Sequence, residues 1–313
     1  MTIEILFYYE SMQNPNGDPG FDNQPRLMSD DTIMVTDVRI KRTMRDYARD
    51  VKGEILFVDY DKKGNAITAD GKAEEIAGSL NGVIGKLLEK TFDVPLFGAL
   101  VPIRSKGSDK KGSDNDGSSE KLTGPLQFGI SRSVNKVQVI NPTIVGRFVG
   151  KVKQGKKQFS TFGKFYSVEY ALIKVQGAVN PRNLSKYAEN KTILKKFEEK
   201  VSMIHDCLWN GTNQLVTRSK YPQRSILYID VDYKDKIYND LPKLVHENES
   251  LKGMAKSLGD SPFVFSEFVD TMEKRKSEIN MIRICGAEDV SDDVQKLVSE
   301  LTKKGLKVEN LSD

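Results

Sequence analysis

The sequence has few of the residues that usually build metal and catalytic sites. Among its 313 residues there are two cysteines, two histidines and one tryptophan. Cys207 and Cys285 have no paired spacing, so neither a disulfide framework nor a thiolate zinc site is expected. His205 and Cys207, two residues apart on an expected helix, point in different directions and do not easily share a metal. We expect no metal ion, no cofactor and no enzymatic activity.

Long apolar runs are also missing. No stretch approaches the roughly 20 apolar residues that span a bilayer, and the first residues, MTIEILFYYES, do not read as a signal peptide. We therefore expect a cytoplasmic protein with no membrane partner. The net charge is only +4, from 48 basic and 44 acidic residues. Composition alone does not establish nucleic-acid binding, but it leaves room for a local basic stripe.

The apolar residues that are present predict one α+β domain, residues 1–313, enlarged by insertions. Residues 2–9 alternate in polarity and predict a strand, and Thr36 is the expected N-cap of a helix that Gly53 ends. The apolar stripe of that helix is Ile40, Met44, Tyr47 and Val51. Further strands are expected at 54–60, 125–133, 165–179 and 225–233, and further helices around 76–87, 193–209 and 294–301. This order favours an RRM-like (ferredoxin-like) antiparallel sheet with helices on one face.

Residues 104–121, RSKGSDKKGSDNDGSSEK, contain no large apolar side chain. Such a segment has nothing to bury, so we expect a flexible, exposed protrusion and not a linker between domains.

The helix after Thr36 carries cations at helical spacing. Lys41 and Arg45 are one turn apart on one expected exposed flank, near the sheet edge, whereas Arg42 lies more directly opposite the core. A separation of about 6 Å matches consecutive phosphates of a single strand, and arginine can bind one phosphate with two hydrogen bonds. The alternative is an ordinary solvated face, in which Arg42 pairs with Asp46.

Three further segments are polar in a way that suits phosphate or ribose. Asn14 and Asn16 in the NPNGDPG loop, with free backbone N–H groups beside Gly17 and Gly20, can form a polar cradle, although a plain turn also explains them. GISRSVNK places polar side chains in a strand-like context, and TRSKYPQR joins cations with a tyrosine. Each segment alone is a weak indication.

Taken together, NPNGDP, the following PR, TDV, and IKR with Arg45 resemble the amino-terminal signature of the Cas seven family, with Ile40 where leucine is usual. These are RAMP-type backbone subunits of type I Cascade, and the resemblance is greatest to subtypes I-B and I-C. Looser similarities in VPLFGAL, GPLQFGISRS and WNGTNQLVTRSK extend it over roughly the first two thirds of the chain.

The resemblance implies an RRM-like palm with finger and thumb insertions, of which residues 104–121 lie in or next to the thumb. It implies a non-catalytic subunit that oligomerises along CRISPR RNA and presents it for pairing with target DNA. The implied partners are that RNA, target DNA through the guide, further copies of the chain and other Cascade subunits. The candidate RNA-binding residues are Asn14, Asn16, Arg26, Thr36, Lys41, Arg42, Arg45, Gln127, Ser131, Arg132, Ser133, Arg218 and Lys220.

Two other functions stay open. In the related type III backbone subunits an aspartate in the loop after the first strand cleaves bound RNA, and Asp18 occupies a comparable place. A turn in which the Asp18 side chain bonds the nearby backbone explains the same residue without catalysis. The third hypothesis is a stand-alone single-stranded RNA binder, which predicts a monomer on RNA instead of a filament.

Overall fold

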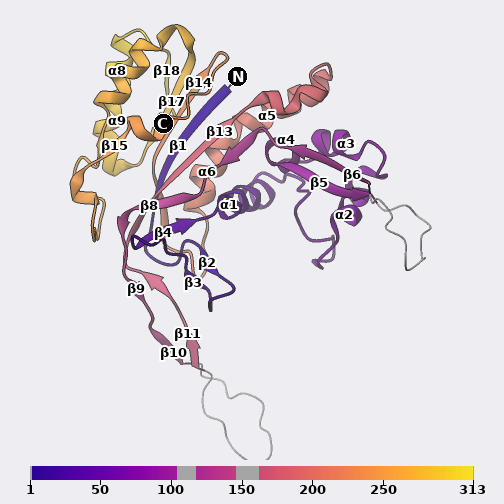
Figure 1. Ribbon diagram of the computed structural model, residues 1–313, viewed down its shortest axis with the longest axis horizontal. Coiled ribbons are helices and arrows are strands. Elements are labelled where there is room, and N and C mark those ends of the chain that lie inside the picture. The colour runs from indigo at the N-terminus through magenta and orange to yellow at the C-terminus, as the bar shows by residue number, and fades with distance from the viewer. Residues whose placement is uncertain (1, 104–117, 146–161, 313) are drawn as a thin grey trace, which may run out of the picture.

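The computed structural model describes residues 2–103, 118–145 and 162–312, which form one large sheet with helices on both faces and two projecting limbs (Figure 1). The helices are α1 (Asp37–Asp50), α2 (Ala69–Ala77), α3 (Val83–Lys90), α4 (Asp93–Phe97), α5 (Lys191–Ser202), α6 (Ile204–Asn213), α7 (Leu241–Leu244), α8 (Ser266–Lys274) and α9 (Ser291–Lys303). The strands of the large sheet are β1 (Thr2–Ser11), β4 (Thr32–Val35), β7 (Leu126–Phe128), β8 (Ser131–Lys136), β13 (Ala171–Val179), β14 (Gln223–Tyr233), β17 (Ile279–Gly286) and β18 (Val308–Asn310).

Five small antiparallel pairs lie outside the large sheet. They are β2 (Gly17–Asp18) with β3 (Gln24–Pro25), β5 (Gly98–Ile103) with β6 (Ser118–Thr123), β9 (Val139–Ile140) with β12 (Ser167–Val168), β10 (Thr143–Val145) with β11 (Phe162–Lys164), and β15 (His246–Glu247) with β16 (Phe263–Val264). No helix in these described ranges is both long and apolar enough to cross a membrane.

The large sheet runs in the order β18-β17-β14-β1-β13-β8-β4, with β7 also beside β13. Every pair is antiparallel except β17 with β18. β1 lies near the centre because all ten of its residues are buried, as its apolar run requires. The predicted α+β class with a mostly antiparallel sheet is therefore confirmed.

Helices cover both faces of the sheet, so the expectation of helices on one face is wrong. Ile5 and Phe7 of β1 share one apolar cluster with residues of α1, α5 and α6. Leu6 and Tyr8, which point the other way, share a second cluster with residues of α7, α8 and α9. The C-terminal third, whose pattern was hard to interpret, supplies this second layer.

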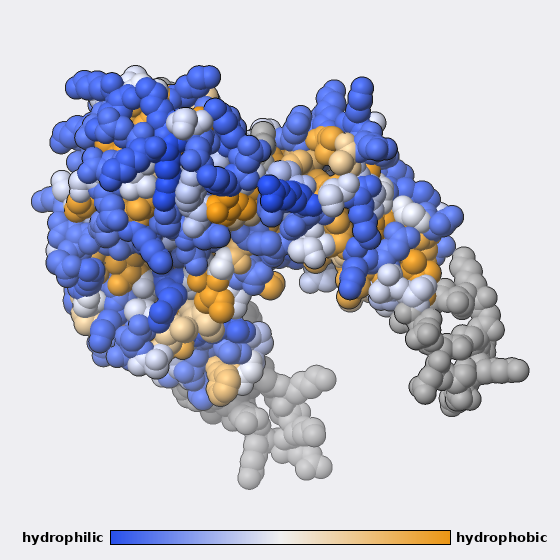
Figure 2. Space-filling model, turned by 45° about the horizontal axis from the view of Figure 1, so that its top comes forward, coloured by the Kyte–Doolittle hydropathy of each residue, from blue (hydrophilic) through white to orange (hydrophobic). Residues whose placement is uncertain are grey.

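Two limbs extend from the sheet, and Figure 2 shows a hollow between them. One limb contains α2, α3, α4 and the β5–β6 hairpin, and the other is the long hairpin of β9, β10, β11 and β12 (Figure 1). The expected flexible segment joins β5 to β6. Its residues 118–121 belong to strand β6 and correct that expectation, whereas residues 104–117 lie outside the described residues.

α1 follows its prediction closely, because the Thr36 side chain accepts from the Arg39 N–H as an N-cap does. Val51 is the exception, since it lies beyond the helix end and is 51% exposed. Residues 54–60 do not form the predicted strand. The Asp93 carboxylate accepts from the N–H groups of Phe57 (2.8 Å) and Val58 (3.0 Å), so a side chain replaces a neighbouring strand.

Other element boundaries differ where glycine or a sharp turn intervenes. The helix predicted around residues 76–87 is two helices, because Gly78 and Gly82 adopt left-handed conformations with φ of 78° and 59°. The helix predicted around 193–209 breaks at Met203, and its second half, α6, continues past Trp209 through Gly211. Gly211 is needed there because a Cβ atom would lie 3.2 Å from Cβ of Tyr47 on the adjacent α1.

Candidate nucleic-acid interface

A cleft of about 730 Å³ lies at the end of β1, where three segments meet. We call it the loop cleft. It is formed by the loop after β1, by residues 163–166 of the β9–β12 limb and by residues 217–220 between α6 and β14. The sequence motifs NPNGDPG and TRSKYPQR, 200 residues apart, therefore line one concave surface.

Asn14 joins two of these segments. Its backbone N–H donates to the Ser219 carbonyl at 3.0 Å, and its own carbonyl accepts from Lys220 Nζ at 2.6 Å. Its side chain donates to the Asn23 carbonyl at 2.6 Å, which closes the loop on itself. Gly17 permits this close packing, because a Cβ atom there would lie 2.9 Å from the Asn23 oxygen. The asparagine-glycine motif thus builds the wall of the cleft.

Lys220 and Arg39 bring two positive charges to this wall. Burial, and secondly the charge of Arg39, lowers the pKa of Lys220 to about 8. Burial likewise lowers the pKa of Arg39, whose guanidinium donates to Thr43 Oγ1 at 2.9 Å. Within residues 2–103, 118–145 and 162–312, no ion pair joins either cation to a carboxylate. Two poorly solvated cations without a counter-charge favour an anionic ligand.

Arg39 was missed by the sequence prediction, although it stands inside the TDVRIKR motif. The helical spacing drew attention to Lys41 and Arg45, which share a different side of α1. The one indication in the sequence is that Arg39 precedes Ile40 of the apolar stripe, so its side chain leaves the helix beside the buried face.

Aromatic rings accompany the cations. The Arg218 guanidinium lies over the Phe165 ring, 5.5 Å from its centroid, and Tyr166 lines the same cleft. Lys164 in the cleft is different, because it pairs with Asp22 at 3.1 Å. Half-buried aromatic rings beside cations provide stacking platforms for the bases of a single strand.

The structure corrects the placement of Lys41 and Arg45, which are not an exposed flank. Arg45 is 9% exposed, binds Asp93 through Nε at 2.9 Å and stacks its guanidinium 4.8 Å from the Phe97 ring centroid. Lys41 donates to Asp37 at 3.0 Å and to Gln127 at 3.2 Å, and its side chain is 12% exposed. These cations lie where α1 packs on β7 and α4. Their RNA contacts stay a prediction.

Four other predicted residues are held by neighbours of their own. Arg42 pairs with Asp46 at 2.7 Å, as the alternative interpretation expected. Thr36 caps α1, and Gln127 is exposed but bonds both Lys41 and the Gly124 carbonyl. Arg26 lies 3.6 Å from Asp18 and keeps its buried Nε without a hydrogen bond.

The residues predicted on β8 lie at the far edge of the sheet, beside β4. Arg132 is exposed and donates to Asp30 at 3.0 Å. Ser133 is buried, accepting from the Ile33 N–H and donating to the Asn135 carbonyl, so it serves the core. Ser131 Oγ is buried with no hydrogen-bond partner in the described part of the chain. Asn16 donates to the Met34 carbonyl at 3.4 Å and ties the loop to β4.

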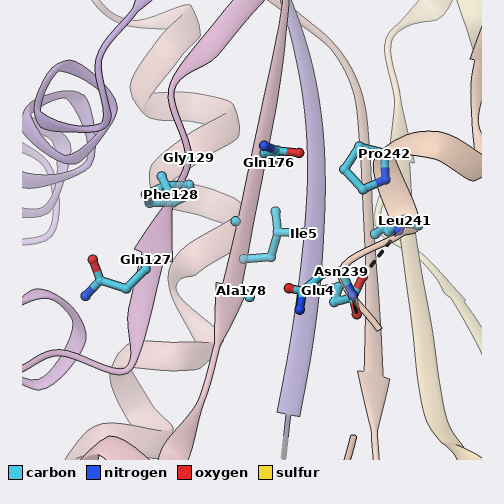
Figure 3. A pocket seen from close by; sticks show the side chains of 11 residues that line it. Glu4, Ile5, Gln127, Phe128, Gly129, Gln176, Ala178, Asn239, Leu241 and Pro242 are labelled. Carbon is cyan, nitrogen blue, oxygen red and sulfur yellow. Dashed lines mark hydrogen bonds between the residues drawn. The ribbon is translucent and has the colours of Figure 1, made fainter. Parts of the chain in front are cut away.

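A second hollow, of about 310 Å³, crosses β1, β7 and β13 (Figure 3). Figure 3 shows Gln127 and Gln176 toward one side, Asn239 and Pro242 toward the other, and Glu4 between them. The Glu4 carboxylate accepts from the backbone N–H groups of residues 238, 239 and 241. No lysine or arginine lines this hollow. The loop cleft, which does contain cations, is the better match for a polyanion.

Comparisons with known proteins agree with the motif resemblance. The family model described as CRISPR-associated protein Cas7 matches residues 1–264. The chain belongs to this family. A curated Cas7 protein of Haloferax volcanii is 26% identical over 302 residues, which cover 90% of this chain and 86% of that protein. Membership of the Cas seven family, stated from the sequence motifs, is thus confirmed.

The fold of this Cas7-family chain is also similar to a solved one. A chain of a CRISPR RNA-guided surveillance complex described as pre-nicking superposes with a TM-score of 0.50 at 11% sequence identity. The match covers 92% of this chain and 93% of that chain. The architecture is therefore retained over nearly the whole length, although few residues are identical.

Proposed function

We propose that this chain is a backbone subunit of a type I CRISPR Cascade effector, of a kind similar to subtypes I-B and I-C. Several copies oligomerise along CRISPR RNA in the cytoplasm and, with other Cascade subunits, present the guide for pairing with target DNA. The observation that carries the proposal is the loop cleft, where Arg39 and Lys220 lack carboxylate partners in the described structure. Family membership and the similar surveillance-complex chain support it.

In this proposal Arg39 and Lys220 bind phosphates, while Phe165 and Tyr166 contact bases. Asn14 holds the wall of the cleft in place, and Arg218 adds a third cation at its mouth. The protein binds the backbone of the RNA and leaves the sequence to be read by base pairing. We therefore expect little sequence preference and a strong dependence of affinity on salt.

We also propose that the core is RRM-like. The segments β1, α1, β8, β13, α5–α6 and β14 follow one another as strand, helix, two strands, helix and strand, and β14-β1-β13-β8 are neighbours in the sheet. That is the order of a split βαβ fold. The lobe of α2–α4 with β5–β6 and the β9–β12 limb are then insertions, both suited to reach a neighbouring copy. The thumb role of residues 104–121 stays part of this proposal.

RNA titrations test the proposal. The variant Arg39→Ala/Lys220→Ala is compared with the parent and with the matched control Arg42→Ala/Arg132→Ala, whose cations pair with Asp46 and Asp30. Fluorescence anisotropy with labelled single-stranded RNA over a range of salt gives the slope of log affinity against log salt. The cleft variant is expected to lower that slope by about 0.7 for each lost phosphate contact. The control is expected to keep the parent slope.

An unchanged slope in the cleft variant contradicts the proposal. The oligomeric state separates the alternative of a stand-alone RNA binder: sedimentation on a long RNA should show cooperative filaments, whereas a stand-alone binder stays monomeric on short RNA and non-cooperative on long RNA.

A further inference from the structure

An enclosed cavity of about 270 Å³ lies between helices α5 and α6 and the strands β1, β14, β17 and β18. It shares no residue with the loop cleft, and no part of the proposed RNA function uses it. We call it the helix-sheet cavity. Its inner end is polar and its walls are apolar, which is the arrangement of a site for a small amphipathic group.

The inner end of the helix-sheet cavity contains a buried carboxylate whose bonding is incomplete. Asp230 is 2% exposed, and its Oδ2 accepts from the Tyr228 hydroxyl at 2.8 Å and from Arg283 Nε at 3.0 Å. Its Oδ1 lies 2.9 Å from Arg283 Nη2 in an ion pair but accepts no hydrogen bond in the described structure. An acceptor left in this state inside a protein favours a donor from outside the chain.

His205 supplies a second buried polar atom in the same cavity. Its Nε2 is buried and has no hydrogen-bond partner among the described residues. Burial lowers the pKa of His205 to about 4 and raises that of Asp230 to about 6. At pH 7 the imidazole is therefore neutral and, with Nδ1 protonated, offers Nε2 as an acceptor beside a carboxylate that is largely ionised.

The rim and the walls narrow the choice of ligand. Glu198 of α5 and Glu309 of β18 are exposed at the rim, and neither forms an ion pair within the described ranges. Three carboxylates and one guanidinium thus surround the cavity, so its charge favours a cation. Ile3, Val201 and Leu311 form apolar walls between rim and inner end, long enough for an alkyl stem.

We propose that the helix-sheet cavity binds a primary alkylammonium group, which donates to Asp230 Oδ1 and His205 Nε2 while its methylene groups lie along Ile3, Val201 and Leu311. A lysine side chain of a partner protein and a free polyamine share this chemistry. A compact ammonium with three donors fits two nearby acceptors, and its charge balances the rim. The site does not depend on RNA binding by the loop cleft.

Isothermal titration calorimetry on the full-length chain tests this proposal with spermidine and with Nα-acetyl-lysine amide as probes. Binding of both indicates a general alkylammonium site, whereas binding of the lysine derivative alone or of spermidine alone identifies the source. Tetramethylammonium has the same charge but no N–H donor, and we expect no binding. Equal binding of tetramethylammonium, or binding of neither probe, overturns the proposal.

Variants at the rim locate the site without risk to the fold. Glu198→Gln/Glu309→Gln is expected to weaken probe binding by about threefold to tenfold, since exposed charge pairs contribute modestly. The matched control is Glu199→Gln on the same helix, which pairs with Lys196 outside the cavity and should bind as the parent does. Equal affinities in the rim variant and the parent overturn the proposed position.

A deeper variant addresses the buried acceptor. Asp230→Asn keeps the size of the side chain and removes its charge, and we expect at least about tenfold weaker binding of either probe. Circular dichroism establishes that this variant is folded before it is titrated. If Asp230→Asn is unfolded, the rim variant alone decides. Tighter binding of inorganic phosphate than of spermidine shows that Arg283 dominates the cavity, which contradicts the proposal.

Discussion

The cations on the lobe side of α1 differ from those at the loop cleft in one respect, their counter-charges. Arg42, Arg45 and Arg49 each have a carboxylate within 3 Å, and Lys41 has one at 3.0 Å. Arg39 and Lys220 have none within the residues that the structure describes. Both groups come from segments rich in lysine and arginine, yet only the second has charge available for a polyanion.

The difference shows why helical spacing is a poor guide to phosphate binding. Spacing places two cations side by side, but a phosphate must compete with every carboxylate already there. Arg45 illustrates this, because Asp93, 48 residues further along the chain, occupies it from the buried side. An unneutralised, half-buried cation is the more specific indication, and it becomes visible only when distant segments are folded together.

The largest test of this comparison removes the buried member. Arg45→Ala leaves Asp93, which is 1% exposed, as an unpaired buried charge, so we expect a loss of about 3–5 kcal/mol in the free energy of unfolding. Arg42→Ala, which breaks a pair at the surface, should cost no more than about 1 kcal/mol. Urea unfolding of both variants measures the difference. Equal, small losses mean that Arg45 is not structural and that the comparison fails.

A smaller effect separates stacking from charge within the loop cleft. Phe165→Ala removes a stacking surface, and we expect RNA affinity to fall by about 1–3 kcal/mol with the salt slope unchanged. Arg218→Ala should instead lower that slope by about 0.7. Affinity titrations at several salt concentrations distinguish the two. A reduced slope in Phe165→Ala indicates that the ring acts only by holding Arg218 in place.

The pKa of Lys220 sharpens the comparison further, because only a cation without a counter-charge titrates so low. Its pKa of about 8 implies that RNA affinity falls by up to about tenfold as pH rises from 7 to 9, where the ammonium loses its proton. Lys220→Arg is the matched variant, since guanidinium does not titrate there, and its affinity should vary little over the same range. Parallel pH profiles for the two proteins contradict the assignment.

The same shift has an opposite consequence for stability. The folded chain releases the Lys220 proton near pH 8, whereas the unfolded chain holds it to about 10.5. Between these values the unfolded state binds more protons, so the Lys220 contribution to stability rises with pH. Loss of RNA affinity and gain of stability over this range would together identify one group.

The sequence predicted the parts of the fold in which a local period determines structure. β1, α1, β14 and α9 lie where their apolar patterns placed them, because each pattern continues for at least two turns or eight residues of strand. The β9–β12 limb was missed since its strands are two or three residues long and pair across a long loop. Short strands leave no period in the sequence to recognise.

The candidate site divides in the same way. The asparagine-glycine loop and TRSKYPQR were predicted as polar and basic segments, and the structure brings Asn14 and Lys220 into contact. That contact could not be predicted, because it depends on the sheet order that places β14 beside β1. The exposure assumed for Arg45 was wrong for the reason given by Asp93: burial by a distant lobe leaves no trace in the spacing of one helix.

The smallest expected effect concerns Asp18, the residue that would reverse the comparison by making the loop a metal-dependent nuclease site. Its Oδ1 accepts from the Gly20 N–H at 2.9 Å and lies 3.6 Å from Arg26, so a turn and a weak ion pair account for it. We expect Asp18→Ala to cost less than about 1 kcal/mol in stability and to leave RNA binding unchanged. Incubation of parent and variant with guide-paired RNA and magnesium measures cleavage directly. Any product that the parent makes and Asp18→Ala does not would replace the backbone role with an enzymatic one, because a phosphodiester can be cut at this loop only if its carboxylate is free to act.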